Sequence, residues 1–259
     1  MVTEYLLQEM WSTMTVAQLK MQFHQIRVEE NKKMQNKIEF ILCNKSLQDA
    51  IPYPKPASHF IPEQYKKLEK LKNGDINQAT IKSCIPFLDA LTSGYIIPFH
   101  QDYLIEAEEN DFTISSSIPS EVMEYHDKKQ LTEEMSNGKQ KAGKFKNEWI
   151  VVTPPGYSCL FIAPLNRKEE RFEILSGVVD TDTYHNTTNI PFLNHRWNQQ
   201  TLIKQGEPMV QVIPFKREPW KMKAGFKWFQ KEHTLAIHKL LTSMVDKYKN
   251  KFWRKKSYK

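Results

Sequence analysis

Apolar positions near the start of the chain recur at helical spacing. Within residues 3–35 no proline interrupts them, and they fall three or four residues apart: Leu7, Met10, Met14, Ala17 and Met21. Such spacing predicts an amphipathic helix with one apolar stripe. We therefore expect residues 1–36 to form a helical N-terminal arm.

A strand-like pattern replaces the helical one at residue 37. The segment KIEFILC (37–43) alternates apolar and polar positions, and the proline-rich stretch after it predicts an extended crossing with a short helix after Pro62. From Cys84 onward, short apolar runs are separated by Pro, Gly, Asn and acidic turns. We predict a mainly β domain over 37–219 with its core at 84–219, a β-clip or jelly-roll-like sandwich or barrel.

Two stretches depart from this β pattern. Residues 127–147 are polar and charged, which predicts a loop. Beyond Trp220 the helical spacing returns, with apolar residues on one face: Ile237, Leu241, Met244, Tyr248 and Phe252. We therefore expect residues 220–259 to form a basic amphipathic helix at the C-terminus.

Positive charge is concentrated at the end of the chain. The formal net charge is +7, and residues 246–259 contain seven basic residues and one acidic residue, so they contribute +6 of it. Aromatic residues stand among these lysines, a composition that suits contact with nucleic acid or with an acidic protein surface. The alternative is a solvated helix end, where lysines are favoured by the helix dipole.

Cysteine usage and hydropathy indicate the compartment. Cys43, Cys84 and Cys159 are widely separated and lack metal-ligand spacing, so we expect them to be reduced. No apolar run approaches the roughly 20 residues needed to cross a bilayer, and the first residues lack the basic start of a signal peptide. We expect a soluble protein without a membrane partner, which stays inside the cell or is carried in a particle assembled there.

A histidine and a carboxylate lie between two strand-like runs. His100 and Asp102 form an H-x-D motif, and His185 or His195 is available as a further ligand. Two histidines and one carboxylate are the ligands of a facial Fe(II) site. The motif resembles that of the iron and 2-oxoglutarate oxygenases, whose double-stranded β-helix suits a β-rich body. In the alternative interpretation, each histidine simply lies at the end of a strand.

The strongest signal lies in residues 153–215. Their motifs follow the same order as the core of the trimeric dUTPase and dCTP deaminase superfamily, which this segment resembles. The matching residues are Pro155 to Tyr157, then Gly177-Val178-Val179-Asp180 with Asp182 and Tyr184, then Asn194, and finally Gly206 with Gln211.

This resemblance implies a nucleotide site at the GVVDTDTY hairpin, with Mg²⁺ as cofactor. Asp180 would be the catalytic carboxylate, which orients the attacking water or holds a sugar hydroxyl. The substrate-binding residues would be Gly177, Asp182, Tyr184, Gln211 and Arg167. Of these, the glycine allows the backbone to approach the ligand and the tyrosine packs on the sugar face.

Three departures from the superfamily pattern favour a shared fold with a changed or absent activity. Pro164-Leu165-Asn166-Arg167 stands where the superfamily has P-R-S-G, so the serine is absent and the arginine is displaced. Thr183 is an extra residue that, by strand alternation, turns Tyr184 to the other face. The glycine-rich phosphate-binding tail is missing. The alternative role for the hairpin is a tight turn whose acids cap backbone amides.

A second resemblance covers about two thirds of the chain. The region from Ile51 to Trp220 looks like an uncharacterised family encoded by tailed phages, notably marine ones. It carries the motifs IPYPKP, IPEQYKK, CIPFLDALTSGYIIP, WIVVTPPGYSCLF and PMVQVIPFKREPWK. This resemblance implies a viral origin and a place in the host cytoplasm or the virion.

Three functions follow in order of preference. The first is a non-catalytic phage protein, either a virion component or a binding module, that forms homo-oligomers or binds other virion proteins. A trimer is the expected oligomer by resemblance. The second is an enzyme that acts on nucleotides through Asp180 and Tyr184, and the third is an Fe(II) oxygenase that uses His100 and Asp102.

Overall fold

A computed structural model describes most of the chain from residue 37 to its end. The described ranges are 37–75, 77–118, 123–136, 140–225, 230–241 and 246–259. The predicted N-terminal arm, residues 1–36, lies outside them.

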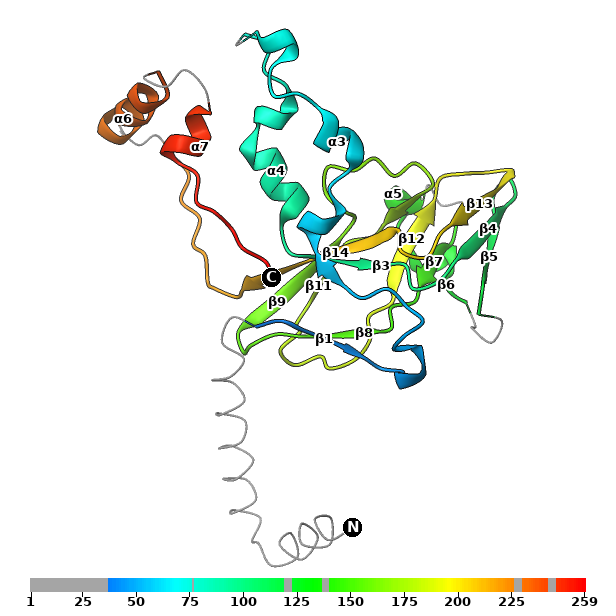
Figure 1. Ribbon diagram of the computed structural model, residues 1–259. Helices are drawn as coiled ribbons and strands as arrows, with labels where there is room; N and C mark the ends of the chain where they lie inside the picture. The colour runs from blue at the N-terminus through cyan, green and yellow to red at the C-terminus, as the bar shows by residue number, and fades with distance from the viewer. Residues whose placement is uncertain (1–36, 76, 119–122, 137–139, 226–229, 242–245) are drawn as a thin grey trace, which may run out of the picture.

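Strands dominate the described body and pair antiparallel in four sheets (Figure 1). The largest sheet has the order β11 (Gly177–Val179), β9 (Tyr157–Ile162), β14 (Pro208–Lys216), β3 (Tyr95–Pro98) and β2 (Lys55–Pro56). A four-stranded sheet has the order β10 (Phe172–Ile174), β12 (Ile190–Asn194), β7 (Ala142–Phe145) and β6 (Glu124–His126). A three-stranded sheet has the order β13 (Gln199–Ile203), β4 (Tyr103–Ala107) and β5 (Phe112–Ser116). The fourth sheet is the pair of β1 (Glu39–Leu42) and β8 (Trp149–Val152). The mainly β prediction is confirmed, and within the described ranges no sheet closes into a barrel.

Aromatic side chains from several sheets form the centre of the core. Its buried rings include those of Phe99, Tyr103, Phe112, Phe145, Phe172 and Phe192. Phe145 and Phe192 stack with their centroids 3.8 Å apart and their planes 7° from parallel. Beside this pair lies Gly143, where an added Cβ would come within 2.6 Å of the Phe192 ring. The core therefore requires β7 to pass close to β12.

Two predictions from the sequence are wrong in detail. The interval 127–147, predicted to be a loop, contains the short helix α5 (Glu133–Ser136) and the core strand β7. The run after Cys84, predicted to be continuously β-like, begins with the helix α4 (Ile85–Thr92), which has a proline in its first turn. The predicted short helix after Pro62 is present as α3 (Glu63–Lys67). Short 3₁₀ turns occupy Lys45–Leu47, Ala57–Phe60, Lys72–Gly74, Ile81–Ser83 and Lys128–Gln130.

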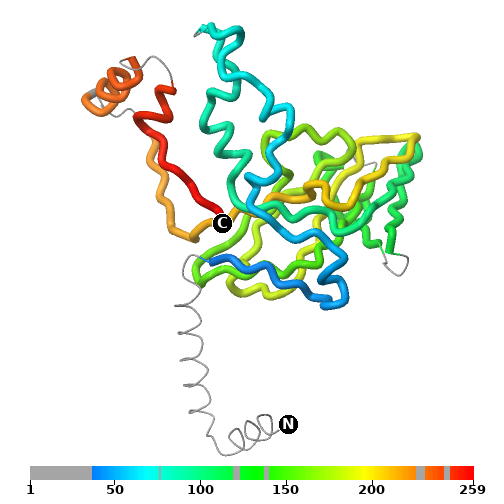
Figure 2. Tube along the Cα trace, viewed as in Figure 1, coloured from blue at the N-terminus to red at the C-terminus, as the bar shows by residue number. Residues whose placement is uncertain are grey.

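The C-terminal region leaves the β body and then returns to it (Figures 1 and 2). In place of one long helix it contains α6 (Gln230–Leu241) and α7 (Lys247–Lys251), and an extended segment follows. In that segment Trp253 Nε1 donates to the Asp89 carboxylate on α4 at 2.9 Å, and Lys256 Nζ donates to the same carboxylate at 2.5 Å. The ring of Tyr258 packs edge-on against Tyr95 of β3. The described part of the chain contains no helix long and apolar enough to cross a membrane.

Candidate functional site

The GVVDTDTY hairpin is a strand followed by a tight turn. β11 pairs antiparallel with β9, with Val179 opposite Cys159. The chain then reverses, and the amides of Thr183 and Tyr184 donate to the Asp180 carbonyl at 3.0 Å and 2.8 Å. Because Tyr184 lies beyond a turn, strand alternation does not set its direction, and its side chain is 47% exposed.

A buried threonine pair anchors this turn to the body. Thr181 is 1% exposed, and its hydroxyl lies 2.7 Å from the hydroxyl of Thr153. The Thr153 amide also donates to the Thr181 carbonyl at 3.3 Å. Asp180 and Asp182, on either side of Thr181, are therefore held in fixed positions.

Both carboxylates of the hairpin bind one arginine. Arg217 follows directly after β14, and its Nη1 donates to Asp182 Oδ1 at 2.9 Å and lies 3.2 Å from Asp180 Oδ1. The same nitrogen donates to the Tyr157 carbonyl at 2.8 Å, and Nη2 donates to Asp182 Oδ2. Asp180 Oδ1 also accepts from the Ser158 hydroxyl at 2.6 Å. The arginine thus occupies the side of the hairpin on which the two acids converge.

The two acids differ in their burial. The Asp182 side chain is 5% exposed and also accepts a hydrogen bond from the Gly156 amide at 2.8 Å, whereas the Asp180 side chain is 62% exposed. Hydrogen bonding to Arg217 holds the pKa of Asp182 below its usual value. Asp182 therefore acts as a buried structural acid, and Asp180 remains accessible on one side.

Other residues predicted to bind substrate lie apart from this hairpin or face solvent. Gly177 has open space around its α-carbon, so no close backbone approach requires a glycine there. Gln211 is 1% exposed on β14 and accepts from the Leu165 amide at 2.8 Å. Its Nε2 donates to the carbonyls of Ala90 and Ser93 at 3.0 Å and 2.6 Å. Gln211 therefore joins α4 and the turn after β9 to the central sheet.

The residues of the iron hypothesis make other contacts. His100 is 3% exposed, and its Nε2 lies 3.0 Å from Gln101 Nε2. Asp102 accepts from Lys204 Nζ at 2.9 Å and from the Gln205 amide at 2.8 Å. Within the described ranges, no group of three His, Cys, Asp or Glu side chains lies close enough to hold a metal ion.

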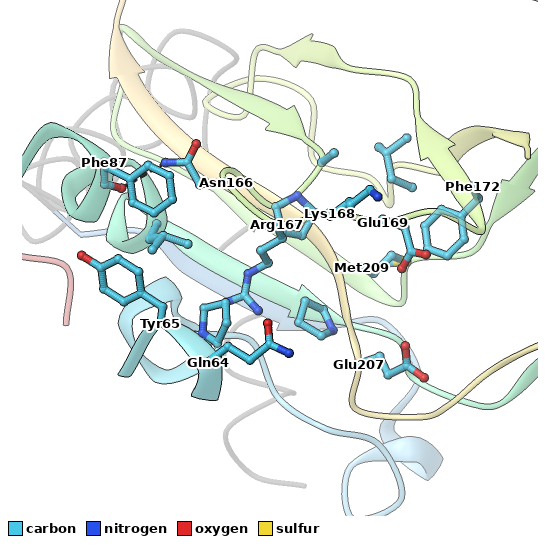
Figure 3. Close-up of a pocket in the computed structure, with 16 residues that line it drawn as sticks. Gln64, Tyr65, Phe87, Asn166, Arg167, Lys168, Glu169, Phe172, Glu207 and Met209 are labelled. Carbon is cyan, nitrogen blue, oxygen red and sulfur yellow. Dashed lines mark hydrogen bonds between the residues drawn. The ribbon is translucent and has the colours of Figure 1, made fainter. Parts of the chain in front are cut away.

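Arg167 lines a cavity of about 470 Å³ that the sequence did not reveal (Figure 3). The cavity lies between α3, α4, the chain from β9 to β10, and the start of β14. Asn166 adopts a left-handed conformation (φ 56°), and its Nδ2 donates to the Phe87 carbonyl on α4 at 3.1 Å. This turn directs the neighbouring Arg167 side chain toward Gln64 of α3.

Comparison with known proteins gives a structural resemblance alone. No family model matches the chain, and no curated protein matches it. A variant of the dUTPase from phage phi11 of S. aureus aligns with 74% of this chain and 98% of its own length, with 12% sequence identity and a TM-score of 0.38. The dUTPase of Staphylococcus bacteriophage 80alpha aligns with 74% of this chain and 98% of its own length, with 14% identity and a TM-score of 0.34.

Proposed function

We propose that this chain is a non-catalytic structural or binding component of a phage, built on a dUTPase-like β scaffold and acting as a homo-oligomer. The observation that carries the proposal is the position of Arg217. A general base must present its carboxylate to a substrate or to the attacking water. Here Arg217 and Ser158 both bind Oδ1 of Asp180, and Asp182 is buried against Arg217.

One observation supports the enzyme alternative. The Asp180 side chain is 62% exposed, so one face of this carboxylate stays open. In that alternative Asp180 would orient water for attack on a nucleotide bound with Mg²⁺. A ligand panel separates the two functions.

Thermal unfolding of the full chain should not shift when deoxynucleoside triphosphates and Mg²⁺ are added. A ligand that binds the folded state raises the unfolding midpoint, and a ligand at 100 times its Kd adds about 2.7 kcal/mol to the free energy of unfolding. We expect the unfolding midpoint of the Asp180→Ala variant, like that of the wild type, to stay unchanged with every nucleotide. A midpoint that rises with one nucleotide in the wild type, and does not rise in Asp180→Ala, would establish the enzyme function instead.

The oligomeric part of the proposal rests on α6. This helix stands away from the β sheets, and four of its aliphatic residues are 37% to 74% exposed: Leu235, Ile237, Leu240 and Leu241. Apolar side chains on an amphipathic helix are normally buried. A second copy of this chain is the partner we propose for them, since most soluble oligomers are homo-oligomers.

Light scattering on the purified chain should give a molar mass that is a multiple of 30.6 kDa. The double substitution Leu240→Glu with Leu241→Glu places charge on the apolar face and should shift the mass toward the monomer. Lys231→Glu, at an exposed position on the same helix, is the control and should leave the mass unchanged. A wild-type monomer at high concentration would refute the oligomer.

A further inference from the structure

The cavity beside Arg167 is large enough to enclose a small organic molecule. Its volume of about 470 Å³ falls within the range of about 300 to 1,000 Å³ that is typical of ligand pockets. None of its lining residues belongs to the GVVDTDTY hairpin or to α6. A ligand site here therefore goes beyond the proposed function and can be tested separately from it.

Aromatic and aliphatic side chains form most of the cavity wall. The rings of Tyr65 and Phe87 stack with their centroids 5.6 Å apart and their planes 21° from parallel. Leu91, one helical turn after Phe87 on α4, also lines the cavity. Phe172 and Met209 lie on the side opposite Phe87 (Figure 3). This wall suits a ligand with a flat apolar body, because burying apolar surface contributes about 25 cal/mol per Å².

One nitrogen of the Arg167 guanidinium has no partner. Its Nη2 is shielded from solvent and has no hydrogen-bond partner among the described residues. Burial lowers the pKa of this guanidinium, and no carboxylate lies close enough to reverse the effect. A buried unpaired donor costs about 1–3 kcal/mol, and more when it is charged. An anion that bound to Arg167 would remove this cost.

The hydroxyl of Tyr65, whose ring lines the cavity, is a second polar group without a partner. Its hydroxyl is shielded from solvent and likewise has no hydrogen-bond partner in the described ranges. A phenol donates one hydrogen bond, and a guanidinium nitrogen donates as well. The Tyr65 hydroxyl points away from the Arg167 guanidinium (Figure 3), so an anion held by Arg167 meets the Tyr65 ring and not its hydroxyl.

The other charges in the cavity limit the charge of the ligand. Glu169 and Glu207 also line it, and both bind Arg171, whose Nη2 lies 2.7 Å from Glu169 Oε2 and 2.5 Å from Glu207 Oε2. Two carboxylates on one arginine leave one net negative charge on that side of the cavity. Lys168 pairs with Glu170 and adds no free cation. A polyphosphate would be repelled here, whereas a single carboxylate balances Arg167 alone.

We propose that this cavity binds a small aromatic carboxylate, with its carboxylate on Arg167 and its ring against the apolar wall that includes Tyr65, Phe87 and Leu91. Fixed walls favour such a ligand. Gln211 and Asn166 tie α4 to the turn that carries Arg167, so the site is largely formed before the ligand binds. Preorganisation of this kind reduces the entropy lost on binding.

Titration calorimetry of the full chain with 2-naphthoate tests the proposal. We expect measurable binding that weakens about tenfold or more in Arg167→Gln, because a hydrogen bond to a charged group contributes about 1.5–3 kcal/mol. Tyr65→Phe keeps the ring that lines the cavity and should leave the affinity within about twofold. The neutral analogue 2-naphthamide should bind the wild type about tenfold more weakly than the acid.

Lys168→Gln is the matched control, since Lys168 is the adjacent basic residue on the same cavity wall. Lys168→Gln should leave the affinity for 2-naphthoate within about twofold. If Lys168→Gln and Arg167→Gln lose the same affinity, the binding is unspecific charge attraction and the proposal is overturned. Absence of 2-naphthoate binding to the wild type, or tighter binding of dUTP than of 2-naphthoate at this cavity, would overturn it as well. Arg167→Gln removes a part-buried guanidinium that makes no ion pair, so the variant should fold. Its circular dichroism spectrum checks this.

Discussion

Replacing Gly94 by alanine should lower the free energy of unfolding by about 3 kcal/mol or more. Gly94 joins α4 to β3 with φ at +65°, a conformation that disfavours any residue with a Cβ. An added Cβ would lie 2.1 Å from the Val212 carbonyl oxygen and 3.0 Å from its carbon. These are backbone atoms of β14, which is paired on both sides within the five-stranded sheet, so they cannot move aside as a side chain would.

Gly206→Ala is the control for this prediction. Gly206 also has a positive φ, +87°, but an added Cβ would meet nothing within 4 Å. Its substitution should cost only the backbone strain, about 1 kcal/mol. Urea unfolding followed by circular dichroism measures both losses. Equal losses in the two variants would mean that contact with Val212 contributes nothing and that the strand is free to shift.

Replacing Asp182 by alanine should lower the free energy of unfolding by about 2 kcal/mol. The change leaves the Gly156 amide and the Arg217 guanidinium without their partner inside the hairpin. Arg217 is 38% exposed and keeps its bond to the Tyr157 carbonyl, so the loss stays below that expected for a fully buried pair. Asp180→Ala is the control, because the Asp180 side chain is 62% exposed. We expect Asp180→Ala to change the free energy of unfolding by no more than about 0.5 kcal/mol. A loss in Asp180→Ala that exceeds the loss in Asp182→Ala would contradict the structural role of Asp182.

The contribution of Asp182 should also depend on pH in one direction. Its folded-state pKa lies below the usual value of 3.8, so its charge stabilises the folded state fully above pH 3.8. This stability is lost as the pH falls through the lower, folded-state pKa. The difference in unfolding free energy between the wild type and Asp182→Asn should therefore be constant near neutral pH and shrink in acid. A difference that grows as the pH falls would contradict the pairing with Arg217.

Short elements were the hardest part of the fold to predict from the sequence. β7 has four residues, lies in a highly charged stretch, and contains Gly143, which weakens any strand pattern. Its place in the core depends on contact with Phe192, about fifty residues later in the chain. α4 begins with the apolar run IPFL, which has no helical period visible over eight residues. The longer apolar runs, such as those of β9 and β14, were predicted correctly because their composition alone favours strands.

The sequence predicted several residues of the candidate sites, but not the tertiary contacts between them. The sequence indicates that Asp180 and Asp182 share a hairpin, and it includes Arg167 among the ligand-binding residues. It does not show that Arg217, beyond the next three strands, binds both acids. Nor does it show that Tyr65 and Phe87 lie across from Arg167, because the contact joins segments about a hundred residues apart. Such pairings depend on tertiary packing, which leaves no local pattern.

The return of the C-terminal segment to α4 has a consequence for binding by the basic tail. Lys256 and Trp253, two of the residues suited to a polyanion, already share the Asp89 carboxylate. A nucleic acid or acidic protein that bound this segment would first have to displace Asp89, so Asp89 competes with such a partner for Lys256 and Trp253. Because Asp89 is tethered to the same molecule, it acts at a high effective concentration, and only a multivalent polyanion would replace it.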